Sequence, residues 1–151
     1  MRKRLWLTAI LLVIVVLLAG CAGHPKGMKS LRWLTDAEKE KVTEIALNTP
    51  EAVQAKNNYG TYTTSLDWVA IDWHDHAFDS FGIDYDYQQP ESQKWISEHV
   101  PKSAEFYSEV IINFGEPPQL ESRVAINPDT GKVANIQQFG LKLPPYYKNN
   151  Q

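Results

Sequence analysis

The sequence has a single cysteine, Cys21, and none at any later position. One cysteine cannot form a disulfide within the chain, and zinc sites built from thiolates need several of them. Cys21 directly follows a long apolar run at the beginning of the chain. The folded part of the protein must therefore be stabilised by its hydrophobic core, without a disulfide, a thiolate metal site or a cysteine nucleophile.

The sequence motifs of several common enzyme classes are also missing. There is no glycine-rich phosphate loop, no dinucleotide-binding fingerprint and no serine in a Gly-x-Ser-x-Gly elbow. The formal net charge is −3, so the surface as a whole disfavours the phosphates of nucleic acids. We therefore expect a protein without a cofactor, without a nucleic-acid partner and without catalytic activity.

The first residues are typical of an export signal. Arg2, Lys3 and Arg4 precede an apolar run, Leu5 to Leu18, that is shorter than the about 20 residues of a membrane-spanning helix. The run ends in Leu18-Ala19-Gly20-Cys21, which resembles the lipobox of bacterial lipoproteins. The resemblance implies cleavage after residue 20 and diacylation of Cys21. A plain transmembrane anchor and cleavage elsewhere are the alternatives.

Lipidation at Cys21 would set the location of the protein. We expect a prokaryotic protein held at the cell membrane or envelope, with its domain facing outside the cytoplasm. Two or three acyl chains would make the attachment essentially permanent, because each buried methylene contributes about 0.8 kcal/mol. The membrane is therefore the first expected partner, and the lipid anchor is the contact.

The composition divides the chain into four parts. Residues 1–20 form the expected signal peptide, and residues 21–33, with Gly, His, Pro, Lys and Ser, predict a flexible tether. Residues 34–143 carry periodic apolar patterns and predict a single domain. Residues 144–151 begin with two prolines and predict a polar C-terminal tail.

Helix signals lie at the beginning of the domain. Thr35 and Glu38 have the spacing of a capping box, which predicts a helix from Asp36 to about Leu47. Thr49 and Pro50 then suit the cap and first turn of a second helix, ending at about Lys56. Two helices are therefore expected before the first strand.

The rest of the domain is rich in strand-forming residues. Apolar and aromatic patterns predict strands at Thr61–Trp73, Ile83–Tyr87, Phe106–Phe114, Leu120–Ile126 and Lys132–Gln138. The segment Gln88–Pro101 fits either a short helix after Pro90 or an inserted loop. The fold class is α+β, with two N-terminal helices packed on an antiparallel sheet of about four strands.

One stretch offers metal ligands. If the first strand continues to residue 76, Asp72, His74 and His76 share one face, because strand side chains alternate. Two imidazoles and a carboxylate suit zinc or another divalent metal. The alternative is an acidic, solvated hairpin tip in which the histidines do not converge. The same residues are the only candidates for a hydrolase.

Aromatic residues supply a second set of candidates. The strand alternation assigns Trp68 and Trp73 to the core. Trp95, Tyr146 and Tyr147 are not assigned in this way and are candidate binding residues, since aromatic rings provide large, rigid contact areas.

Two segments of the domain resemble the exported PepSY and PepSY-like domains. These are ALNTPEAV, Ala46 to Val53, and VAINPDTGKVANI, Val124 to Ile136, in which Asn127 stands where an acidic residue is more usual. The resemblance implies an α+β domain that acts as a binding or protease-inhibiting module and carries over no catalytic residue.

These patterns lead to two main hypotheses of different kinds. The first is a membrane-anchored lipoprotein whose domain binds an envelope protein or peptide through a sheet edge or an aromatic groove. The second is a metal- or ligand-binding envelope domain centred on Asp72, His74 and His76.

Overall fold

A computed structural model describes residues 24–74 and 78–141. Its helices are α2 (Asp36–Leu47), α3 (Pro50–Tyr59) and α4 (Pro90–His99), and its strands are β1 (Tyr62–Asp72), β2 (Asp79–Ile83), β3 (Glu105–Phe114), β4 (Leu120–Ile126) and β5 (Val133–Gly140). The strands form one antiparallel sheet in the order β2-β1-β3-β4-β5. The expected α+β class is confirmed, with five strands instead of about four.

The two expected N-terminal helices begin where their caps predict. The Thr35 side chain accepts from the Glu38 backbone N–H, and the Glu38 carboxylate accepts from the Thr35 backbone N–H, at 3.3 and 2.8 Å. Thr49 caps α3, and Pro50 is its first residue. This helix continues to Tyr59, beyond the expected end, and Gly60 terminates it with a φ of 78°.

The second strand was predicted in the wrong place. It covers Asp79–Ile83 and pairs with β1, whereas we expected Ile83–Tyr87. The chain leaves the ladder after Ile83 because the Asp67 carboxylate accepts from the Tyr85 backbone N–H at 3.2 Å. The segment Gln88–Pro101 was expected to be either a short helix or an inserted loop. The structure has the helix, α4, with Pro90 in its first turn.

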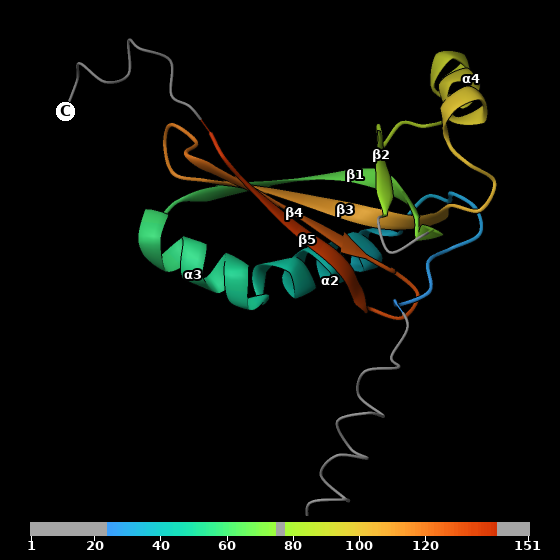
Figure 1. The fold of residues 1–151 in the computed structure, drawn as a ribbon. Coiled ribbons are helices and arrows are strands. Elements are labelled where there is room, and N and C mark those ends of the chain that lie inside the picture. The colour runs from blue at the N-terminus through green and yellow to red at the C-terminus, as the bar shows by residue number, and fades with distance from the viewer. Residues whose placement is uncertain (1–23, 75–77, 142–151) are drawn as a thin grey trace, which may run out of the picture.

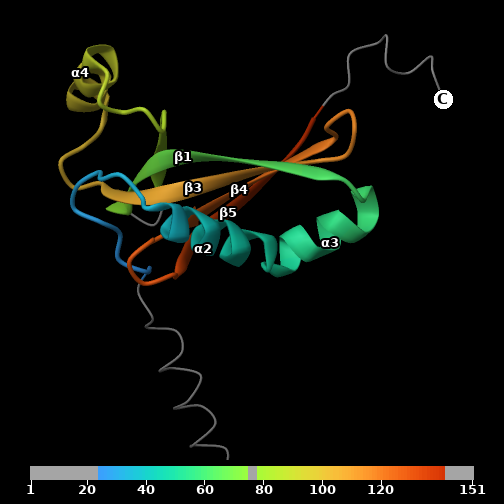
Figure 2. The ribbon, with the colours of Figure 1, turned by 180° about the vertical axis from the view of Figure 1, so that it is seen from behind.

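The main core lies between the sheet and the helices α2 and α3, which follow one face of the sheet (Figures 1 and 2). Trp68 is fully buried in this core, as expected. A smaller cluster on the opposite face contains Val69, Ile71 and Tyr107, and the partly buried Trp73 packs against it. The second half of β1 is therefore covered on both sides.

The N-terminal segment, residues 24–33, differs from the expected flexible tether. Met28 is 7% exposed, and its backbone N–H and C=O form hydrogen bonds of 2.9 and 3.0 Å with Phe106. Pairing between β3 and β4 begins only at Ser108, so the backbone of Phe106 is left open to this segment. Residues 21–23 lie outside the described residues, as do residues 1–20 and 142–151.

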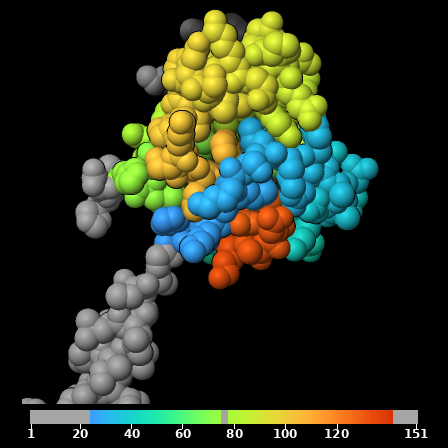
Figure 3. All heavy atoms as spheres, turned by 90° about the vertical axis from the view of Figure 1, so that its right-hand side faces the viewer, coloured from blue at the N-terminus to red at the C-terminus, as the bar shows by residue number. Residues whose placement is uncertain are grey.

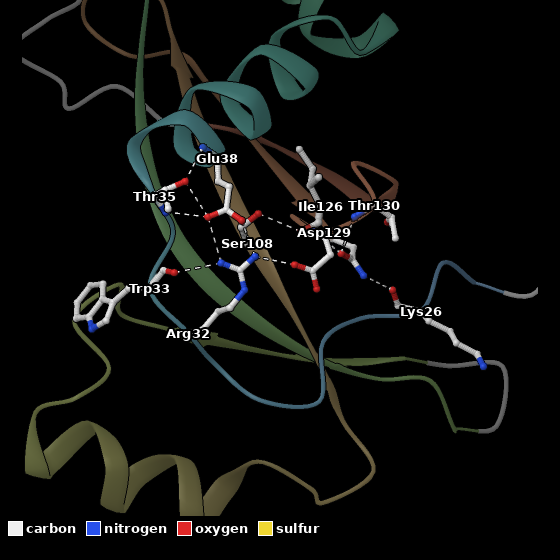
Figure 4. Close-up of polar contacts among 10 residues, drawn as sticks. Lys26, Arg32, Trp33, Thr35, Glu38, Ser108, Ile126, Asp129 and Thr130 are labelled. Carbon is white, nitrogen blue, oxygen red and sulfur yellow. Dashed lines mark hydrogen bonds and ion pairs between the residues drawn. The ribbon is translucent and has the colours of Figure 1, made fainter.

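Arg32 joins the N-terminal segment to two other elements. Its guanidinium donates to Glu38 at the beginning of α2 and to Asp129 in the turn between β4 and β5, with shortest distances of 2.7 and 2.6 Å (Figure 4). The hydrogen bonds from Arg32, with those from Thr35, lower the pKa of Glu38 to about 2. One residue thus holds the segment, the helix and the turn together.

The packing of the N-terminal segment can be tested at Gly27. A Cβ on this residue would lie 2.7 Å from both Glu105 Cβ and Tyr107 Cζ, so Gly27→Ala forces the segment away from the sheet. We expect a loss of about 1–3 kcal/mol in the free energy of unfolding, measured by urea denaturation. In the control, Gly82→Ala, the new Cβ meets nothing within 4 Å. Equal stability of the two variants would contradict the described packing.

Candidate functional site

A groove separates α4 from the edge of the sheet. This α4 groove encloses about 340 Å³ and is lined by Gly82, Ile83, Asp84, Glu91, Ser92, Trp95 and Ile96. No residue of α4 is fully buried, although Ile96 and the following Val100 pack against the main core. The helix therefore stands apart beyond β2, as Figure 1 shows, and leaves space between the two elements.

The walls of the α4 groove are held in place by local contacts. The Gln93 side chain donates to the Tyr87 backbone C=O at 2.6 Å, which connects the helix to the segment before it. Trp95 stacks on His99, with ring centroids 4.9 Å apart and an angle of 14° between the planes. The indole is thereby held in one orientation while the residue stays 38% exposed.

The floor of the α4 groove is an open strand edge. Among the described residues, β2 forms backbone ladder pairs with β1 only, so its outer edge has no neighbouring strand. Gly82 adds no side chain to this edge, and a Cβ there would have nothing within 4 Å. Asp84 and Glu91 are both exposed and line the same groove. The site combines free backbone groups, an aromatic wall and two carboxylates.

The predicted metal ligands are only partly brought together. β1 ends at Asp72, and the side chain of this residue accepts from the Ser103 hydroxyl at 3.1 Å. His74 Nε2 lies 3.7 Å from Asp72 Oδ1, with the imidazole 72% exposed. His76 lies outside the described residues. Within residues 24–74 and 78–141, no three acidic, histidine or cysteine side chains form a group that suits a metal ion.

Of the three predicted aromatic binding residues, the described part of the chain contains Trp95. Trp95 lies in the α4 groove, where its exposed face is available to a ligand. Tyr146 and Tyr147 lie outside the described residues, and so does the predicted lipidation site, Cys21.

Sequence reasoning missed a polar cluster on the sheet face opposite the helices. Glu109 in β3 lies directly across from Asp67 in β1, and its carboxylate is 3.7 Å from the Arg123 guanidinium. The Glu109 side chain is 9% exposed. Burial raises the pKa of Glu109 to about 7; Arg123 opposes this shift, and Asp67 and Glu121 reinforce it.

The polar cluster lacked a clear signal in the sequence. Glu109 occupies a polar position in an alternating strand, a pattern that predicts a solvated side chain. Only the register of β1 against β3 places a second carboxylate opposite it.

Comparisons with protein-family models, with curated proteins and with solved structures find no match for this chain. In the part of the chain that the structure describes, none of the helices has the length and hydropathy needed to cross a bilayer.

The buried Glu109 predicts a pH dependence of stability. Its pKa is about 7 in the folded state and 4.5 in the unfolded chain, so unfolding releases its proton at pH values between these two. Stability should therefore be highest below about pH 4.5 for this group and fall as pH rises to 7 and above, by on the order of 3 kcal/mol. Glu109→Gln should remove this dependence and stabilise the protein at pH 8.

Urea denaturation at pH 5 and pH 8 measures the effect of Glu109→Gln. The control is Glu40→Gln, because Glu40 is exposed on α2. An unchanged difference between the two pH values in the Glu109 variant would show that another group causes the dependence.

Proposed function

We propose that this protein is a prokaryotic lipoprotein, attached to a membrane through Cys21, whose domain binds an extended segment of a partner protein in the α4 groove. The open edge of β2 is the observation that carries this proposal. An extended peptide can add to such an edge through main-chain hydrogen bonds, while side-chain pockets select its sequence.

The residues beside the β2 edge favour particular partner chemistry. Trp95 offers an exposed aromatic surface, the type of residue that is enriched among strong binding contacts. Asp84 and Glu91 place two carboxylates in the same groove and would attract a lysine or arginine side chain. The proposed ligand is therefore an extended peptide segment with a basic residue.

A binding role without catalysis agrees with the other features of the chain. The resemblance of two segments to PepSY-like domains supports a binding or inhibitory module. The alternative function, metal or ligand binding, is favoured by the approach of His74 to Asp72 at 3.7 Å. A hydrolase would depend on the same two residues together with His76.

The lipid anchor can be tested in a bacterial host. We expect the mature chain to begin at Cys21 and to carry acyl chains, which mass spectrometry of the N-terminal peptide detects. Cys21→Ala should abolish the acyl mass and the release of the signal segment at that position. The matched control is Ser30→Ala, a change at an exposed residue that should leave both unchanged. A wild-type chain without acyl mass would contradict the anchor.

Peptide binding can be tested with two synthetic ligands that differ in charge. An extended peptide of alternating valine and lysine should bind and change the tryptophan fluorescence, whereas the matching valine–glutamate peptide should bind much more weakly. Added salt should weaken the binding of the lysine peptide, because its charges lie near exposed carboxylates.

Variants identify where the lysine peptide binds. Trp95→Ala should weaken binding by about tenfold, equivalent to about 1.4 kcal/mol, and Glu91→Gln should weaken it in a salt-dependent manner. The control is Phe139→Ala, which removes a 45% exposed aromatic ring from the opposite edge strand, β5. Equal losses in the Trp95 and Phe139 variants would contradict binding in the α4 groove.

A further inference from the structure

The N-terminal segment is fixed to the sheet almost as far back as the proposed anchor. His24 stacks on Trp73, with ring centroids 4.4 Å apart, and its Nε2 lies 3.4 Å from a Glu105 carboxylate oxygen. The Tyr107 hydroxyl donates to the Pro25 backbone C=O at 2.7 Å. The N-terminal segment therefore packs on the domain from His24 onward.

Further hydrogen bonds hold the next residues of the N-terminal segment. The Gly27 backbone N–H donates to Glu105 Oε2 at 2.9 Å, and the Asn127 side chain donates to the Lys26 backbone C=O at 2.6 Å. The segment is thus connected both to the beginning of β3 and to the turn between β4 and β5.

These contacts limit how far the domain can move from a lipidated Cys21. Three residue steps separate Cys21 from His24, and a fully extended chain covers about 11 Å at most over that length. The polar headgroup layer is itself about 5 to 8 Å thick on each side of a bilayer. The end of the domain that carries His24 must therefore remain at the membrane surface.

From this geometry we propose that the domain docks end-on against lipid headgroups, with the end that carries His24 facing the bilayer. This near end contains the beginning of β3, the end of β1 and the turn between β4 and β5. Figure 3 shows it face-on: the blue N-terminal segment lies between α4 in yellow and the orange-red turn. The inference rests on the proposed acylation of Cys21.

The side chains at the near end suit a headgroup layer. Phe78 is 38% exposed and packs on Trp73, with ring centroids 5.3 Å apart. Lys26 and Lys29 are exposed, and the Lys29 side chain is 85% accessible. A lysine at a membrane interface buries its aliphatic stem and keeps its ammonium group in water, and an exposed phenylalanine ring is one of the apolar groups that enter the boundary between headgroups and acyl chains.

The opposite end of the domain lies far from this surface. β1 ends at the near end and has eleven residues, so its first residue lies about 33 Å from that end. α3 reaches toward that far end, as Figure 1 shows, and Asn58 is exposed on it. The two ends therefore provide a near and a far position on the same molecule.

The test uses the full acylated chain in vesicles of phosphatidylcholine and phosphatidylglycerol, with a nitroxide on part of the headgroups. An acylated Cys21 has no free thiol, so a single new cysteine can be labelled selectively with a fluorophore. Lys26→Cys reports on the near end and Asn58→Cys on the far end. We expect the nitroxide headgroups to quench the label at position 26 several-fold more than the label at position 58.

The outcomes separate docking from the anchor itself. Equally weak quenching at both positions in an acylated, vesicle-bound chain overturns end-on docking and leaves the anchor intact. Stronger quenching at position 58 also overturns it. Mass spectrometry of the same sample detects the acyl chains, and their absence overturns the proposed anchor together with this inference.

A second pair of variants tests the aromatic contact. Phe78→Ser should reduce the quenching at position 26, because the near end loses an exposed ring, whereas Phe139→Ser on β5 should not. If the label at position 26 is quenched as strongly in both variants as in the parent chain, Phe78 makes no contact with the lipid and that part of the proposal is wrong.

Discussion

The long antiparallel pairing of β1 with β3 is the constraint on which the rest of the molecule depends. It runs from Tyr62 opposite Phe114 to Ile71 opposite Glu105 and forms the centre of the sheet. β2 and β4 each cover only part of this central pair. The part of β3 that β4 leaves open accepts the backbone of Met28, and the shortness of β2 leaves space for the α4 groove.

The β1–β3 register also creates an unfavourable polar contact. It places Asp67 opposite Glu109, and burial disfavours the charge on both, so that both pKa values rise. The Arg123 guanidinium lies near enough to Glu109 to stabilise its negative charge in part, but it also donates to Glu121 at 2.6 Å. The sheet tolerates this arrangement because Glu109 can hold a proton near neutral pH.

Local signals predicted the elements whose chemistry is local. The capping box at Thr35 and the Thr49-Pro50 pair gave correct helix starts, because caps act within one turn. The alternation from Phe106 to Phe114 gave a correct strand. The predictions of a strand through Tyr85 and of a flexible tether around Met28 differ from the structure because distant residues decide both. The Asp67 carboxylate accepts from the backbone N–H of Tyr85, and the open edge of β3 pairs with the backbone of Met28. Of the candidate site, the sequence singled out Trp95 as a candidate binding residue, whereas the groove beside it depends on strand pairing that only the fold reveals.

The proposed anchor and the proposed peptide site are linked by their positions along β1. Asp79 in β2 pairs with Asp72, at the end of β1 that carries the N-terminal segment, and Ile83 pairs with Trp68 four residues farther from that end. The α4 groove begins at Gly82 and Ile83, within the near half of the sheet. A domain docked end-on would hold this groove close to the lipid. The strand edge would then be presented to partner segments that emerge near the membrane surface, and a basic residue in such a segment would meet Asp84 and Glu91 there.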